Sequence, residues 1–99
     1  MIYVRCEALP SQAIVDKQGS GGAFVNCWVN TEDVLRAETL ARQWIVEQGW
    51  IVVAVEELRV IPEAEQRNGR HRERVQEARE QGGSLVFHKW AADGEPPTA

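Results

Sequence analysis

The sequence predicts an α+β domain in which two helices cover one face of a four-stranded mixed sheet. Four segments have the pattern of strands, of which the first two clearly alternate apolar and polar side chains with a period of two and the third is apolar on both faces. Two other segments space their apolar side chains as amphipathic helices do. The 99 residues are enough for one such domain, which we place at residues 1–90, with a disordered tail at 91–99.

The first two strands are predicted at residues 2–9 and 23–30. Each alternates along its length, so each should bury one face against the core. The segment between them, 10–22, begins with a proline and ends in glycines, which is typical of a long flexible connection. Consecutive strands joined in this way most simply pair antiparallel.

A helix is predicted between the second strand and Gly49, which should end it. Thr31 or Asn30 is expected to cap its first amide groups. Leu35 and Val46 fall outside its apolar stripe and should be partly exposed. The predicted core-facing stripe consists of Val34, Ala37, Leu40, Ala41, Trp44 and Ile45.

Residues 50–61 are apolar on both alternating faces up to Glu56, which predicts a third strand covered on both sides. We expect Ile51, Val53 and Val55 to face the helices. A strand, a helix and a strand of these lengths predict a crossover that places the second and third strands parallel.

The rest of the chain is predicted to form a loop to about residue 70, a short helix over 71–81 and a fourth strand over 84–90. The resulting order is ββαβαβ. Two helices on one face of the sheet would give a sandwich close to the ferredoxin-like architecture, whose own element order is βαββαβ.

Alternation leaves the opposite face of the sheet with large aromatic and polar side chains, and no helix of this prediction covers it. A contiguous apolar patch of that kind usually marks an interaction site. We therefore predict a non-enzymatic, homodimeric binding or regulatory module. The candidate interaction face consists of Tyr3, Arg5, Phe24, Asn26, Trp28, Val86, His88 and Trp90, with Trp50, Val52 and Ala54 on the same side.

Three other uses of this face stay open. Arg5, Asn26, Asn30 and His88 could be the polar groups of a small-ligand pocket. By analogy of fold alone with dimeric α+β barrels, a pocket near His88 could belong to a small enzyme. No catalytic residue is assigned, because nothing in the sequence orients His88 as a base. Alternatively, the 10–22 connection or the tail could cover the face.

Cys6 and Cys27 are predicted to be buried thiols on neighbouring strands. Two cysteines without a recognisable signal peptide predict a reducing, cytoplasmic location. No apolar run reaches the roughly 20 residues that a membrane helix needs. His71 and His88 lack the spacing to complete a zinc site with the cysteines, so no metal or cofactor is predicted.

The Arg67–Arg74 segment holds four arginines and could contact phosphate or nucleic acid. The net charge of −4 and the lack of aromatics among the arginines favour ion pairs instead. The glutamates expected as partners are Glu63, Glu65, Glu73 and Glu77.

The segments GGAFVNCWVN, GWIVVAVEE and GGSLVFHKW together resemble a group of small bacterial proteins of unknown function. The resemblance covers most of residues 1–90. Gly21, Gly22, Trp28, Gly49, Trp50 and the run Phe87 to Trp90 carry it. It implies a bacterial source and no particular activity.

Overall fold

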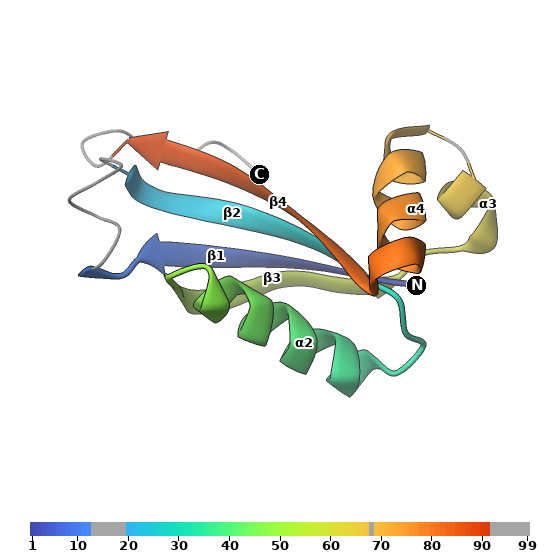
Figure 1. The fold of residues 1–99 in the computed structure, drawn as a ribbon, viewed down its shortest axis with the longest axis horizontal. Coiled ribbons are helices and arrows are strands. Elements are labelled where there is room, and N and C mark those ends of the chain that lie inside the picture. The colour runs from blue at the N-terminus through green and yellow to red at the C-terminus, as the bar shows by residue number, and fades with distance from the viewer. Residues whose placement is uncertain (13–19, 68, 92–99) are drawn as a thin grey trace.

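The computed structural model describes residues 1–12, 20–67 and 69–91. The predicted tail beyond Ala91 and most of the predicted 10–22 connection lie outside these residues. The elements in chain order are β1 (Ile2–Pro10), β2 (Ser20–Val29), α2 (Val34–Glu47), β3 (Trp50–Val60), α3 (Glu63–Arg67), the 3₁₀ turn η1 (Gly69–His71), α4 (Arg72–Gln81) and β4 (Gly83–Ala91). The domain is α+β, with a four-stranded sheet (Figure 1).

The strand order is β3-β1-β2-β4, and every pair of neighbours is antiparallel. The predicted mixed sheet is therefore wrong. β2 and β3 do run in the same direction, because each is antiparallel to β1, but β1 lies between them. β3 is thus an edge strand, and the exposure of Ile51 and Val53 shows that it is not covered on both faces as predicted. The order also differs from a simple ferredoxin-like arrangement.

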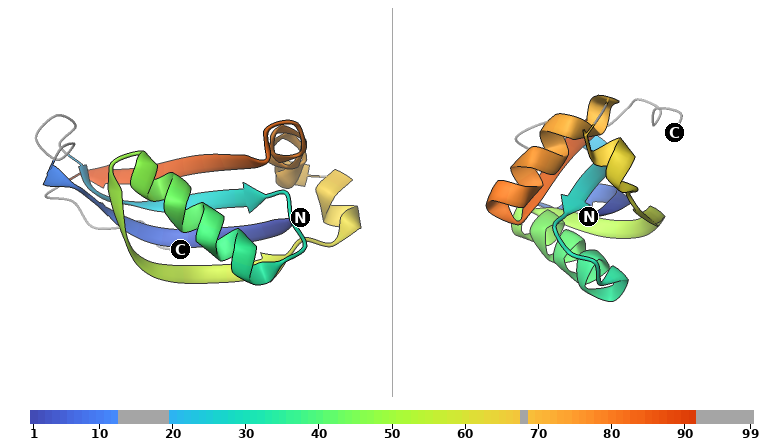
Figure 2. Two further views of the ribbon diagram at one scale, coloured as in Figure 1. Left: turned by 60° about the horizontal axis from the view of Figure 1, so that its bottom comes forward. Right: turned by 90° about the vertical axis from the view of Figure 1, so that its right-hand side faces the viewer.

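The two longer helices pack on opposite faces of the sheet, which corrects the prediction that both cover one face. Ala37, Ala41 and Ile45 of α2 join the main core on one face. Val75 and Ala78 of α4 pack on the other face, at one end of the sheet (Figures 1 and 2). Val75 and Ala78 form the short apolar stripe of α4. That stripe covers aromatic side chains of β1 and β2 that α2 does not reach.

The helix predicted before Gly49 is confirmed, but its cap is not the predicted one. The Asp33 side chain accepts a hydrogen bond from the backbone N–H of Arg36, at 3.2 Å. The Thr31 hydroxyl accepts one from the N–H of Asp33. Helix α2 begins at Val34 as a result, and Val34 is 41% exposed rather than in the core. A short helix, α3, also lies where a loop was predicted.

Two irregularities in β3 change which of its side chains face α2. Its register against β1 shifts twice, so that Val53 and Glu56 have no partner residue on β1. Each extra residue reverses the alternation. Ile51 and Val53, predicted to face the helices, are therefore 54% and 46% exposed. The β3 residues that pack in the main core are Trp50, Val52, Val55 and Leu58.

Small side chains on the two central strands leave room for Trp50 to reach across the sheet. Ala8 and Ala23 are directly paired and fully buried. The Trp50 ring contacts Phe87 on the opposite edge strand, with ring centroids 5.6 Å apart. Both edge strands are thereby tied into one core. None of the helices in the described ranges is long and apolar enough to cross a membrane.

Candidate functional site

A polar depression of about 440 Å³, here called the sheet hollow, lies on the face opposite α2. Strand pairing brings its side chains together, because Arg5 of β1 is the cross-strand partner of both Asn26 on β2 and Glu57 on β3. In the next row, Tyr3 stands opposite Trp28 and Arg59. The residues that line the hollow are Tyr3 and Arg5 of β1, Asn26 and Trp28 of β2, Glu57 and Arg59 of β3, His71 of η1 and His88 of β4.

One end of the hollow is closed by η1 and α4. The indole N–H of Trp28 donates to Nδ1 of His71 at 3.0 Å. Since Nδ1 accepts this bond, the neutral His71 ring carries its proton on Nε2. Tyr3 packs edge-on against Trp28, with ring centroids 5.3 Å apart. Tyr3 and Trp28 are only 7% and 6% exposed, so the open aromatic patch predicted here is largely covered.

Arg5 lies in the middle of the hollow without an ion pair among the described residues. Its guanidinium carbon lies 4.5 Å from the centroid of the Phe24 ring. Its Nε atom is buried and has no hydrogen-bond partner within the described chain. Glu57, directly opposite on β3, contacts Arg59 instead, at 3.3 Å. Arg5 is therefore half-buried without an ion pair among the described residues, and its contacts are with the Tyr3 hydroxyl and the Phe24 ring.

Asn26 and His88 face Arg5 from the next strands. Asn26 Nδ2 lies 3.3 Å from His88 Nε2. Asn26 Oδ1 is buried and has no hydrogen-bond partner within the described ranges. Unsatisfied polar atoms cost free energy when buried, and native sites that keep them usually do so for a reason.

Burial raises the pKa of the Tyr3 hydroxyl above 10.0, and the nearby Arg5 guanidinium partly opposes this. Tyr3 is therefore protonated at neutral pH and can donate a hydrogen bond.

Beyond Arg5, the next row of this face pairs Glu7 with Phe24, and the end of the face is apolar. Trp90 packs against Phe24, with ring centroids 5.4 Å apart. The Trp90 ring also lies over Gly22, where an added Cβ would overlap it. Leu9 and Ile51 are cross-strand partners and both are exposed. We call Leu9, Ile51 and Trp90 the apolar end of this face.

The eight predicted interaction residues all lie on the face opposite α2, but they divide into three groups. Five of them line the hollow: Tyr3, Arg5, Asn26, Trp28 and His88. Phe24 and Trp90 stack next to it, and Val86 packs against the cluster under α4.

Three side chains of the hollow were not predicted: Glu57, Arg59 and His71. Glu57 and Arg59 share the face of Ile51, because the two shifts in β3 cancel, and the prediction placed the row of Ile51 under the helices; His71 lies here because α4 crosses to this face. Trp50 and Val52, predicted on this face, lie on the other one. Asn30, offered as a polar group of the pocket, lies outside the hollow, and its backbone N–H bonds to the carbonyl of Gly82.

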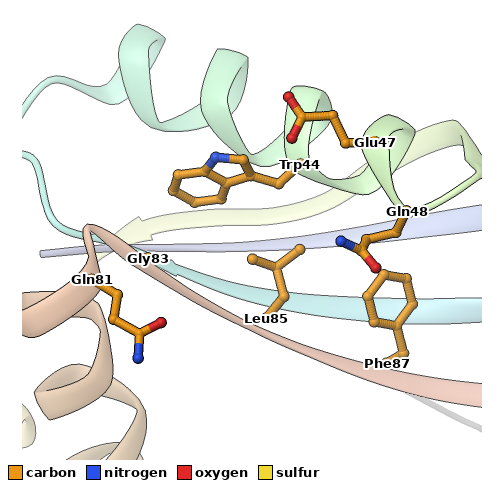
Figure 3. Close-up of a pocket in the computed structure, with 7 residues that line it drawn as sticks. All are labelled: Trp44, Glu47, Gln48, Gln81, Gly83, Leu85 and Phe87. Atoms are coloured by element: carbon orange, nitrogen blue, oxygen red, sulfur yellow. The ribbon is translucent and has the colours of Figure 1, made fainter.

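A second depression, the helix groove, lies on the α2 face and has a volume of about 410 Å³. Figure 3 shows Trp44 of α2 on one side and Leu85 and Phe87 of β4 on the other. The remaining lining residues are Glu47, Gln48, Gln81 and Gly83. Its apolar floor continues the main core, because Leu85 and Phe87 pack against that core.

Cys6 and Cys27 are buried and unpaired, as predicted. Burial raises the pKa of the Cys6 thiol to about 11, and that of Cys27 also above its ordinary value. Neither thiol is a ready nucleophile at neutral pH. Within the described ranges, no three His, Cys, Asp or Glu side chains are grouped to hold a metal ion.

Fold and site together define a small antiparallel α+β domain with a depression on each face of its sheet. No family model, curated protein or solved structure matches the chain. The two depressions and their chemistry therefore carry the functional argument.

Proposed function

We propose that this chain is a small-ligand binding module and that the sheet hollow is its binding site. The Arg5 guanidinium, which has no ion pair among the described residues, supports this proposal most directly. Burying a charge without a partner is costly, and a bound ligand would supply the partner. The volume of about 440 Å³ lies within the range of small-molecule sites.

Amide NMR with mixtures of small carboxylic acids, amines and neutral amides tests this proposal. The Trp28 indole N–H is the natural reporter, because it lies in the hollow and donates to His71. We expect saturable shifts at Trp28 and Asn26. Shifts confined to Trp44 and Leu85 in the helix groove, or no shift with any mixture, would contradict the proposal.

We propose second that two copies associate through the apolar end of the same face. The exposed Leu9–Ile51 pair beside Trp90 supports this, since exposed apolar patches commonly become interfaces. Light scattering should then show a dimer for the native chain and a monomer for Ile51→Lys. Leu35→Lys is the matched control, because Leu35 is 79% exposed on α2. A native monomer at all concentrations would refute the dimer.

The contacts give less support to a phosphate or nucleic-acid site at the Arg67–Arg74 segment. Arg67 ion-pairs with Glu63, and Arg74 with Glu77 at 3.8 Å. These pairs use charge that a phosphate would need. For catalysis, His88 contacts an amide and not an orienting carboxylate, so we favour binding over an enzymatic role. A reducing, cytoplasmic location also remains our proposal, with the two unpaired thiols as its support.

A further inference from the structure

We propose that the ligand of the sheet hollow is a small organic carboxylate that pairs with the guanidinium of Arg5. This inference rests on the hollow being a binding site, and it adds the chemical class of the ligand.

The charged side chains around the hollow are not evenly paired. Arg59 contacts two carboxylates, Glu57 at 3.3 Å and Glu65 at 3.0 Å, so its charge is balanced within the fold. Arg5 has no such partner among the described residues, although Glu57 stands opposite it. The hollow therefore holds one unbalanced positive charge in a protein whose net charge is −4.

The surroundings of Arg5 decide which of its N–H groups a ligand can reach. Phe24 lies against its guanidinium, its Nε atom is buried, and a terminal N–H hydrogen-bonds the Tyr3 hydroxyl, so the other terminal N–H groups are the donors that remain for a ligand. Two parallel N–H groups of a guanidinium match the two oxygens of a carboxylate. Stacking on Phe24 also fixes the guanidinium before the ligand arrives, which lowers the entropy lost on binding.

The side chains that line the hollow offer more hydrogen-bond donors than free acceptors. Nε2 of His71 carries a proton, because Nδ1 accepts from Trp28. The Tyr3 hydroxyl is protonated at neutral pH. Among the described residues, Glu57 is the one carboxylate that lines the hollow, and it already contacts Arg59. A site rich in donors favours a ligand rich in acceptors, which again indicates an anion.

A carboxylate fits better than a phosphate. Phosphate sites generally use several cationic side chains, or free backbone N–H groups at a glycine-rich loop or helix N-terminus. The floor of the hollow is a paired sheet, whose amides are engaged between strands. Tyr3 and Trp28 form an aromatic wall at one end, which suits a ligand with a flat apolar body beside its carboxylate.

Benzoate, the neutral isostere benzamide and inorganic phosphate are the probes for this test. Amide NMR should show that benzoate shifts Trp28 and Asn26 and binds at least about tenfold more tightly than benzamide or phosphate. Arg5→Met should lower benzoate affinity about tenfold or more, and Arg5→Lys should restore it only partly, because a lysine cannot bind bidentately. Arg67→Met is the matched control and should leave benzoate binding unchanged.

Asn26→Asp provides a second variant of the same shape. It places a carboxylate opposite Arg5, so benzoate affinity should fall while any benzamide binding stays the same. Equal binding of benzoate and benzamide, tighter binding of phosphate, or unchanged benzoate binding in folded Arg5→Met would each overturn the carboxylate assignment. Hollow shifts with amines or amides alone would overturn this assignment and leave the binding module standing. No hollow shift with any probe would overturn both.

Discussion

The sheet hollow and the helix groove have nearly equal volumes, about 440 and 410 Å³, but they arise in different ways. The groove exists because α2 packs over β3, β1 and β2 and leaves β4 largely uncovered. Its floor, Leu85 and Phe87, is the margin of the main core. The hollow is lined by polar side chains from five separate elements, brought together by strand register.

The comparison teaches that size alone does not identify a site. In the groove, each apolar side chain already has a structural partner in the core. In the hollow, Arg5 has no charged partner within the described chain, and Arg5 Nε and Asn26 Oδ1 lack hydrogen bonds there. Changes in the groove should therefore alter stability, and changes in the hollow should mainly alter binding.

The largest loss of stability is expected for Gly83→Ala in the groove. An added Cβ at Gly83 would overlap the Trp44 ring, and overpacking of this kind costs about 2–3 kcal/mol. Urea unfolding measures the loss. The control is the same change in a Trp44→Leu background, where the overlap is gone and the loss should shrink. An equal loss in both backgrounds would show that Trp44 does not pack against Gly83.

Val75→Ala tests how α4 packs against the Tyr3–Trp28 cluster at one end of the hollow. Val75 is fully buried against the Tyr3–Trp28 cluster, and its truncation should lower the free energy of unfolding by about 2 kcal/mol. The Trp28 indole signal should also shift, because α4 packs less tightly over it. Gln76→Ala, an exposed change on the same helix, should cost less than about 0.5 kcal/mol. Similar losses in both variants would contradict docking of α4 through Val75.

The core between the two depressions should respond to alkaline pH. Burial raises the pKa of Cys6 from 9.0 to about 11. Above pH 9.0 the unfolded thiol ionises before the folded one, so the folded state loses stability as the pH rises. This contribution reaches about 2 kcal/mol near pH 11. Unfolding of Cys6→Ala should show a weaker decline over this range, and an identical decline would refute the assignment.

The smallest effect on stability is expected at Arg5, where binding should change most. Arg5→Met removes a cation–π contact with Phe24 of about 0.5–1 kcal/mol. It also removes a buried, unsatisfied Nε, whose penalty is of similar size. The two terms offset each other, so thermal unfolding should change by less than about 1 kcal/mol. A loss above about 2 kcal/mol would show that Arg5 mainly holds the fold together.

The sequence predicted the helices and strands better than their arrangement. Period-two alternation located β1, β2 and β4 correctly, and the apolar stripe located α2. Alternation says nothing about which edge of the sheet the next strand joins, so the order β3-β1-β2-β4 was not predicted. The face of the sheet on which α4 packs was also not predicted, because Val75 and Ala78 could pack on either face.

The candidate site was predicted in part, for a related reason. Tyr3, Arg5, Asn26, Trp28 and His88 lie on regular strands, where alternation alone assigns the face. Glu57 and Arg59 lie on the row of Ile51, which the prediction placed under the helices because an apolar strand does not show which of its two rows faces the core. His71 enters through tertiary packing of η1. The glutamate pair inside an apolar strand was the one available signal of irregularity in β3.

The same irregularity in β3 has a consequence for how crowded copies of the chain behave. β3 is a long edge strand with exposed Ile51 and Val53, a combination that invites other chains to add strands and aggregate. The extra residues Val53 and Glu56 bend and twist that edge, and Glu56 adds an exposed charge. A bent, charged edge is a poor template for added strands, so we expect deletion of the two extra residues to increase aggregation of the protein.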